Sequence, residues 1–150
     1  MKLNAANTAI IKRLLVGRNN RPLRSILAKI EPADIASLFG SLNRRECRLL
    51  TDALISIDKA SDTLFEVPEQ QLGDVLRKIT SEQKLKTLLF AEIDHAAYCL
   101  GLMGEGERLE LLEQVEESKR EKICQYLSYP EESAGRMMYT RVFCLSIDLK

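Results

Sequence analysis

The most constraining feature of the sequence is a repeated unit of about a dozen residues, which begins with polar side chains and ends with leucines. In residues 68–79, the apolar positions are Leu72, Val75, Leu76 and Ile79. Their spacing of i, i+3, i+4 and i+7 places them on one face of an α-helix, whereas a strand would require strict alternation. The same spacing recurs in residues 31–42, and units that also run from polar to apolar residues occur at 43–54, 58–67, 81–93 and 104–115.

The polar starts of these units carry residues that begin helices. Three pairs fit the capping box, in which the N-cap side chain and the side chain three residues later each accept a hydrogen bond from the other's backbone N–H. They are Asn43 with Glu46, Thr80 with Gln83, and Ser128 with Glu131. Three prolines suit the first helical turn, where a missing N–H is tolerated: Pro32, Pro68 and Pro130. Each unit is therefore predicted to form one short helix.

Helices of about three turns are marginal in water when isolated, so these units must stack on their neighbours. Two consecutive units span about 24–26 residues, which lies in the range of helical solenoids. The predicted fold class is all-α. We expect a right-handed superhelix (solenoid) of about ten short helices, with more than half of the 150 residues helical.

Both ends of the chain depart from the repeat. Residues 7–16 are predicted to form a separate helix, so that residues 1–22 make up an N-terminal helix and turn. Residues 141–147 are β-branched and aromatic, which favours a strand. We therefore expect a helical domain over residues 23–138 and the start of a second, truncated domain over residues 139–150.

The charge is balanced overall but unevenly placed. The chain holds 22 basic and 22 acidic residues, yet residues 1–50 hold ten lysines and arginines against three acids. The balance gives no sequence-wide attraction to nucleic acid. The basic front end is open to three interpretations: contact with anionic lipid, contact with an acidic partner, or a solvated helix face. No apolar run approaches the ~20 residues of a membrane span, and no secretory signal is present, so we expect a soluble, cytosolic chain.

The residues that most often carry catalysis or bind transition metals are sparse. The four cysteines form no C-x-x-C pair, and His95 is the only histidine, so the spacing does not fit a zinc site. The cysteines have apolar neighbours in the sequence and are predicted to be reduced, structural thiols. His95 and Cys99 lie four residues apart without an acid to orient them, which is weak support for a nucleophilic pair. We predict no enzymatic activity.

Two segments carry a resemblance to a known family. Residues 129–138 read Y-P-E-E-S-A-G-R-M-M, which resembles the junction between the cytosolic N domain of MgtE-type magnesium transporters and the CBS domain pair that follows it. Residues 30–39 read I-E-P-A-D-I-A-S-L-F, which is similar to the opening of the same domain, with Glu31 where the family has histidine. The resemblance extends over about residues 23–145 and implies that the terminal strand begins a CBS domain.

The resemblance implies a regulatory role. In that family the domain senses intracellular Mg²⁺ in a homodimer, through acidic residues that face the CBS domains, and gates the pore. The implied cofactor is therefore weakly bound, regulatory Mg²⁺. The implied partners are the protein's own CBS and transmembrane domains beyond residue 150, with no nucleic acid. The implied location is the cytosolic face of the inner membrane.

Two residues match acidic, metal-facing positions of the family: Asp62 and Asp94. Further acids of the family's motif are replaced here by His95 and Tyr98, which predicts that Mg²⁺ binds weakly. Asp62 is open to a second interpretation, as a solvated acid within a helix, and Asp94 to one as an N-cap residue. Two further functions also stay open: a non-transporting MgtE-N/CBS-type protein that acts as a helical interaction module, and an adaptor resembling flagellar motor-switch modules.

Overall fold

The computed structural model describes residues 5–17, 20–130 and 133, which form ten α-helices and one 3₁₀-helix and contain no strand. The elements are α1 (Ala5–Leu15), α2 (Arg21–Leu27), α3 (Pro32–Ala36), η1 (Phe39–Ser41), α4 (Arg44–Ile55), α5 (Ala60–Phe65), α6 (Glu69–Lys78), α7 (Ser81–Phe90), α8 (Ile93–Gly101), α9 (Glu105–Glu113) and α10 (Glu117–Ser128). The prediction of an all-α chain of about ten short helices is confirmed. The expected strand over residues 141–147 lies outside the described residues.

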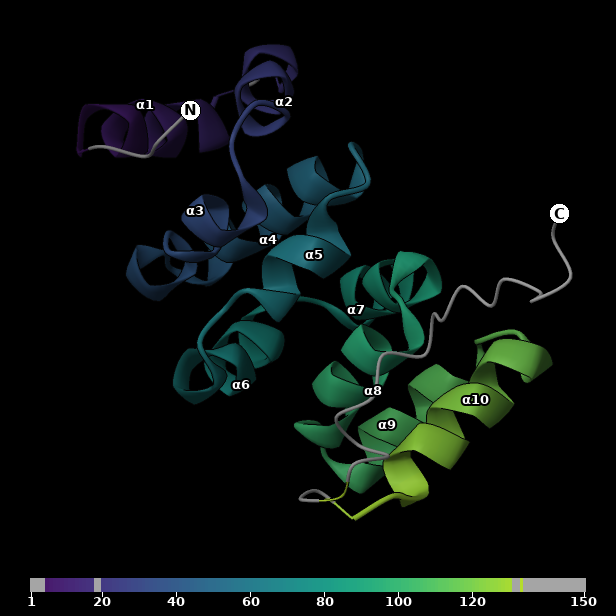
Figure 1. The fold of residues 1–150 in the computed structure, drawn as a ribbon. Helices are drawn as coiled ribbons and strands as arrows, with labels where there is room; N and C mark the ends of the chain where they lie inside the picture. Colours follow the sequence, from purple (N-terminus) through teal and green to yellow (C-terminus); the bar gives the residue numbers. More distant parts are fainter. Residues whose placement is uncertain (1–4, 18–19, 131–132, 134–150) are drawn as a thin grey trace, which may run out of the picture.

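The helices stack in chain order into an elongated superhelix, with α1 and α2 at one end and α9 and α10 at the other (Figure 1). Contacts also reach beyond immediate neighbours: α4 packs against α1, α2, α6 and α7, and α8 packs against both α5 and α10. This pattern is expected of short helices that cannot bury their apolar faces alone. None of the described helices combines the length and the apolar character needed to cross a bilayer.

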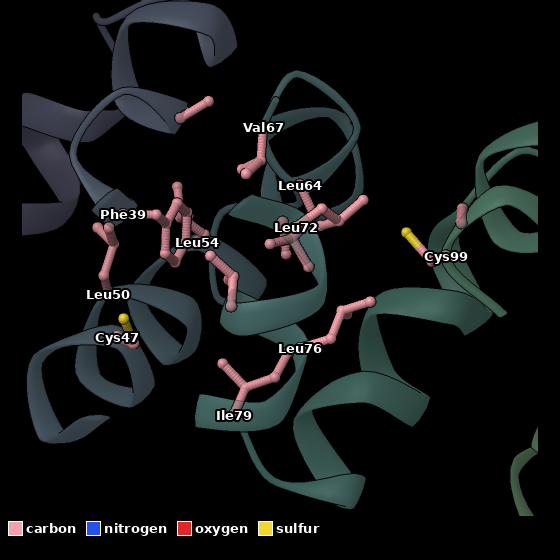
Figure 2. Packing of buried hydrophobic residues seen from close by; sticks show 14 of the residues in the cluster. Phe39, Cys47, Leu50, Leu54, Leu64, Val67, Leu72, Leu76, Ile79 and Cys99 are labelled. Carbon is pink, nitrogen blue, oxygen red and sulfur yellow. The ribbon is translucent and has the colours of Figure 1, made fainter. Parts of the chain in front are cut away.

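The apolar faces meet in one continuous core, which runs from Ile11 in α1 to Tyr126 in α10. Figure 2 shows its central part, where side chains from η1, α4, α5 and α6 point toward one another. Phe39 is fully buried there, next to leucines of α4 such as Leu54. Most leucines of the repeated sequence unit therefore lie in the interior of the superhelix, as the spacing predicts, whereas Leu89 and Leu109 are exposed.

Two of the three predicted capping boxes are confirmed. The Asn43 side chain accepts a hydrogen bond from the Glu46 backbone N–H at 3.0 Å, and the Glu46 carboxylate accepts one from the Asn43 N–H at 3.0 Å. Thr80 and Gln83 make the same reciprocal pair at the start of α7. Each pair satisfies two N–H groups that the helix itself leaves without partners.

The third predicted capping box, at Ser128, is wrong. Ser128 is the last residue of α10, and its hydroxyl donates to the Gln125 carbonyl at 2.6 Å. Pro130 consequently follows a helix end, where proline is also favoured because it cannot continue the helix. Pro32 begins α3 as predicted, whereas Pro68 occupies the N-cap of α6, one position before the first turn.

The prediction of structural thiols fits Cys47 and Cys99 and is wrong for Cys124, and Cys144 lies outside the described residues. The three described cysteines are free thiols, and Cys47 and Cys99 are buried. Cys124 is exposed, because it points away from the core while the adjacent Ile123 is fully buried. It lines a shallow groove of about 410 Å³ between α9 and α10.

Lysine side chains from later parts of the chain donate hydrogen bonds to backbone carbonyls at the C-terminal ends of earlier helices. The Lys59 ammonium donates to the carbonyls of Ala28 and Ile30, both at 2.9 Å, just after the end of α2. The Lys119 ammonium donates in the same way to the carbonyls of Leu89 and Ala91 at the end of α7. Helix ends leave carbonyls without partners, and lysine is a favoured donor to them. These contacts help to fix how successive turns of the superhelix sit on one another.

Candidate functional site

Asp62 lies on α5, a helix of six residues that follows a tight turn. The turn contains Asp58 with φ at 54°, a left-handed conformation that aspartate tolerates better than most residues. Asp62 is the third residue of the helix and is exposed. Its carboxylate is therefore free to meet an external cation or surface, and it is also favourably placed near the positive end of the helix.

Asp94 is the second residue of α8 and is half-buried. The N-cap of this helix is Glu92, so the interpretation of Asp94 as the N-cap is wrong. One Asp94 carboxylate oxygen nevertheless accepts a hydrogen bond from the His95 backbone N–H at 3.0 Å. This bond fixes the carboxylate at the start of α8 and leaves its other oxygen for a further partner.

The two acids are carried by helices that pack against each other, and three rings form the contact between them. Phe65, the last residue of α5, stacks on His95 of α8 with ring centroids 3.7 Å apart and an interplanar angle of 15°. Tyr98, one turn further along α8, meets Phe65 edge-on at 5.7 Å. Such aromatic pairs contribute beyond the area that they bury. We call these three residues the α5–α8 aromatic contact.

Burial shapes the chemistry around this contact. Burial raises the pKa of the Tyr98 phenol, and the nearby Glu69 carboxylate raises it further, so Tyr98 is a neutral hydroxyl at physiological pH. The His95 Nδ1 atom is buried without a hydrogen-bond partner among the described residues. Burial raises the pKa of the Cys99 thiol to about 12, which removes the thiolate that a nucleophilic Cys–His pair needs.

The described residues contain no group of three or more histidine, cysteine, aspartate or glutamate side chains placed to hold a metal ion. The chemistry of Asp62 and Asp94 still fits Mg²⁺, which prefers carboxylate oxygens and keeps several of its waters. Each acid can therefore act as a partial ligand, with the remaining ligands supplied by water or by a surface outside this chain. Residues 5–17 and 20–130 alone do not form a closed magnesium cage.

Comparisons with known proteins identify the family to which the chain belongs. The sequence model of the family described as "MgtE intracellular N domain" matches residues 30–132, which is more than half of the chain. The chain belongs to this family. The matched segment contains α3 through α10 and therefore includes both acids and the α5–α8 aromatic contact.

Individual relatives are more distant. The chain is 27% identical over 122 residues to the "Magnesium transporter MgtE" of Bacillus subtilis (strain 168), a match that spans 81% of this chain and 27% of that protein. Two solved structures share the fold: the soluble part of a magnesium transporter (TM-score 0.76, 17% identity) and the cytosolic domain of the Mg²⁺ channel MgtE in complex with ATP (TM-score 0.73, 19% identity). The matches span 87% and 86% of this chain and about half of each solved chain, 52% and 53%.

The α5–α8 aromatic contact is the part of this MgtE N domain that sequence reasoning missed. His95 stands out in the sequence as the only histidine, four residues from Cys99, and both His95 and Tyr98 stand out as replacements for acids of the family motif, whereas Phe65 attracts no notice. The available signal was the i, i+3 spacing of His95 and Tyr98, which places two rings on one face of a helix. The partner ring, 30 residues earlier, becomes evident only once α5 and α8 are seen in contact.

Proposed function

We propose that this chain is the cytosolic regulatory domain of a magnesium transporter or channel, and that it responds to intracellular Mg²⁺ through Asp62 and Asp94. The observation that carries the proposal is the placement of these two acids, in a member of the MgtE N domain family, on two helices in direct contact. The B. subtilis relative, itself called a magnesium transporter, supports the same role.

The regulation follows from an incomplete carboxylate site. Two carboxylates alone cannot satisfy Mg²⁺, which needs near-octahedral oxygen coordination. When bound, Mg²⁺ would supply the positive charge that allows Asp62 and Asp94 to lie against a second acidic surface. Without it, Asp62 and Asp94 repel such a surface, and the two domains separate. We propose that the second surface is a CBS domain that follows this chain.

The arrangement also predicts how tightly the domain alone binds the ion. With few protein oxygens and a site completed from outside, the dissociation constant is expected to be on the order of millimolar or weaker. The α5–α8 aromatic contact has a structural role in this proposal, since it holds α5 against α8 and so fixes the two acids relative to each other. In the proposed assembly, the full-length protein is a homodimer with its pore in the inner membrane and this domain on the cytosolic side.

Protease protection of the full-length protein across a magnesium titration tests the proposal. Wild-type protein should become more resistant as Mg²⁺ rises, because the domains close on one another. The variant Asp62→Asn/Asp94→Asn should need a higher Mg²⁺ concentration for the same protection. A matched control, Glu113→Gln/Glu121→Gln, changes two exposed acids on α9 and α10 and should follow the wild-type curve. Identical curves for wild type and the aspartate variant would contradict the sensing role.

A second function is favoured by one observation. His95 and Tyr98 occupy positions where the resemblance implies acids, and both are engaged with Phe65. This fits a non-transporting member of the family that acts as a helical interaction module. Complementation of a strain deficient in magnesium uptake by the full-length gene separates the two functions. Growth at low magnesium supports the transporter, and failure of a stably expressed protein to restore growth supports the interaction module.

A further inference from the structure

The first 30 residues differ in charge from the rest of the chain. They contain seven lysines and arginines and no aspartate or glutamate, and the first acid is Glu31. The family match begins at residue 30, so α1 and α2 precede the part of the chain that the family describes. The proposed magnesium response uses α5 and α8 and leaves this segment without a role.

The outward face of α1 is unusually apolar. Ile11 and Leu15 point into the core and are fully buried. The opposite face carries Ile10, which is 50% exposed, and is continued by Val16, which is 57% exposed, just after the helix ends. The solvent-facing side of a helix in a globular protein is normally polar. The charged residue on this side of α1 is Arg13. It is exposed, and in the sequence it lies between Ile10 and Val16.

Helix α2 adds further positive charge at the same end of the superhelix. It packs against α1, and the two helices together form one end of the superhelix (Figure 1). Arg21 and Arg24 are exposed on α2, and neither helix has an acid in its first turn. We call Ile10, Arg13, Val16, Arg21 and Arg24 the basic-aliphatic face. It combines exposed aliphatic groups with cations and has no acid within either helix.

We propose that the basic-aliphatic face binds the surface of an anionic lipid bilayer. Arginine side chains would contact the lipid phosphates, and Ile10 and Val16 would enter the boundary between headgroups and acyl chains, as in interfacial helices. The first 38 residues contain no aromatic side chain, which disfavours single-stranded nucleic acid, because its bases are bound by stacking on aromatic rings. The opposite charges of the arginines and of anionic headgroups favour the lipid surface. The proposal does not depend on Asp62 or Asp94.

Sedimentation of the chain with vesicles tests this inference. The chain should bind vesicles of phosphatidylglycerol and phosphatidylcholine, bind phosphatidylcholine alone much more weakly, and lose binding as salt is raised. Arg13→Gln/Arg24→Gln should reduce the partition coefficient by about fivefold for each arginine. Ile10→Gln/Val16→Gln should also reduce the partition coefficient, by about fivefold for each half-exposed aliphatic side chain, because that apolar surface is then no longer moved from water into the bilayer. These residues are exposed, so each variant should keep the wild-type circular dichroism spectrum and melting temperature.

A matched control separates the face from overall charge. Arg77→Gln/Lys122→Gln removes two positive charges from exposed positions on α6 and α10 and should leave vesicle binding unchanged. An equal loss in the control and in the arginine variant would overturn the proposal, since binding would then follow net charge alone. Salt-sensitive self-association of the chain that disappears in Arg13→Gln/Arg24→Gln, without vesicle binding, would overturn it in favour of a second copy as the partner.

Discussion

A half-buried ion pair between α7 and α9 gives the sharpest test of how this superhelix is held together. The Lys84 ammonium contacts the Glu107 carboxylate, and the two side chains are 6% and 36% exposed. Helix α8, which carries Asp94, lies between α7 and α9 in the sequence. The unequal exposure predicts that replacing the two partners has unequal consequences.

The loss in the free energy of unfolding depends on which charge remains after each substitution. Glu107→Gln leaves the Lys84 ammonium buried without its counter-charge. Removing one partner of a fully buried pair costs about 3–5 kcal/mol, and because Glu107 is one-third exposed we expect about 2–3 kcal/mol here. Lys84→Met keeps the buried aliphatic stem, and the remaining carboxylate can turn toward water. We expect this change to cost about 1 kcal/mol or less.

Urea unfolding at neutral pH, followed by circular dichroism, measures both effects. The double variant Lys84→Met/Glu107→Gln should lie close to Lys84→Met, because the buried charge is then absent. Lys86→Met is a matched control on the same helix, since Lys86 pairs with Glu82 at an exposed site and its loss should cost under about 1 kcal/mol. Equal losses for the two single variants, or a larger loss for Lys84→Met, would refute this account of the pair.

Three further predictions concern local structure. Asn43→Ala and Thr80→Ala should each lower the free energy of unfolding by about 1 kcal/mol in urea titrations, whereas substitution by glycine should cost less. Cys124 should react rapidly with a maleimide at neutral pH, because it is exposed. The buried Cys99 should stay protected until the chain unfolds, as mass spectrometry of a Cys144→Ser variant would show. Phe65→Ala should cost about 1–2 kcal/mol, less than a fully buried phenylalanine because the ring is 39% exposed, and an unchanged melting temperature would contradict its packing role.

Features set by neighbouring residues could be predicted from the sequence. The capping boxes at Asn43 and Thr80 involve partners only three residues away, so the spacing alone identifies them. The same pattern at Ser128 was misleading, because a serine three residues before a glutamate fits the end of a helix as well as the start. Cys124 follows the buried Ile123, but successive residues on a helix point in directions about 100° apart. Proximity in sequence therefore does not predict burial.

Features that depend on distant residues could not be predicted in this way. The periodic leucines predict that helices stack, but not that α5 and α8 are the pair in contact. The stacking of Phe65 on His95 and the bonds from Lys59 to the end of α2 each join residues about 30 positions apart. Asp62 and Asp94 are indicated by their match to a family motif and not by the periodicity of the helices. The structure adds that their two helices touch and that Asp94 is not an N-cap.

A magnesium titration of the isotope-labelled chain, followed by NMR, tests the central claim most directly. We predict that the amide resonances of the first turns of α5 and α8 shift together, with a dissociation constant on the order of millimolar or weaker. Asp62→Asn/Asp94→Asn should abolish these shifts without changing the rest of the spectrum. Saturation at micromolar Mg²⁺ at another location, or the same shifts in the double variant, would contradict the claim that these two acids form the magnesium-responsive face.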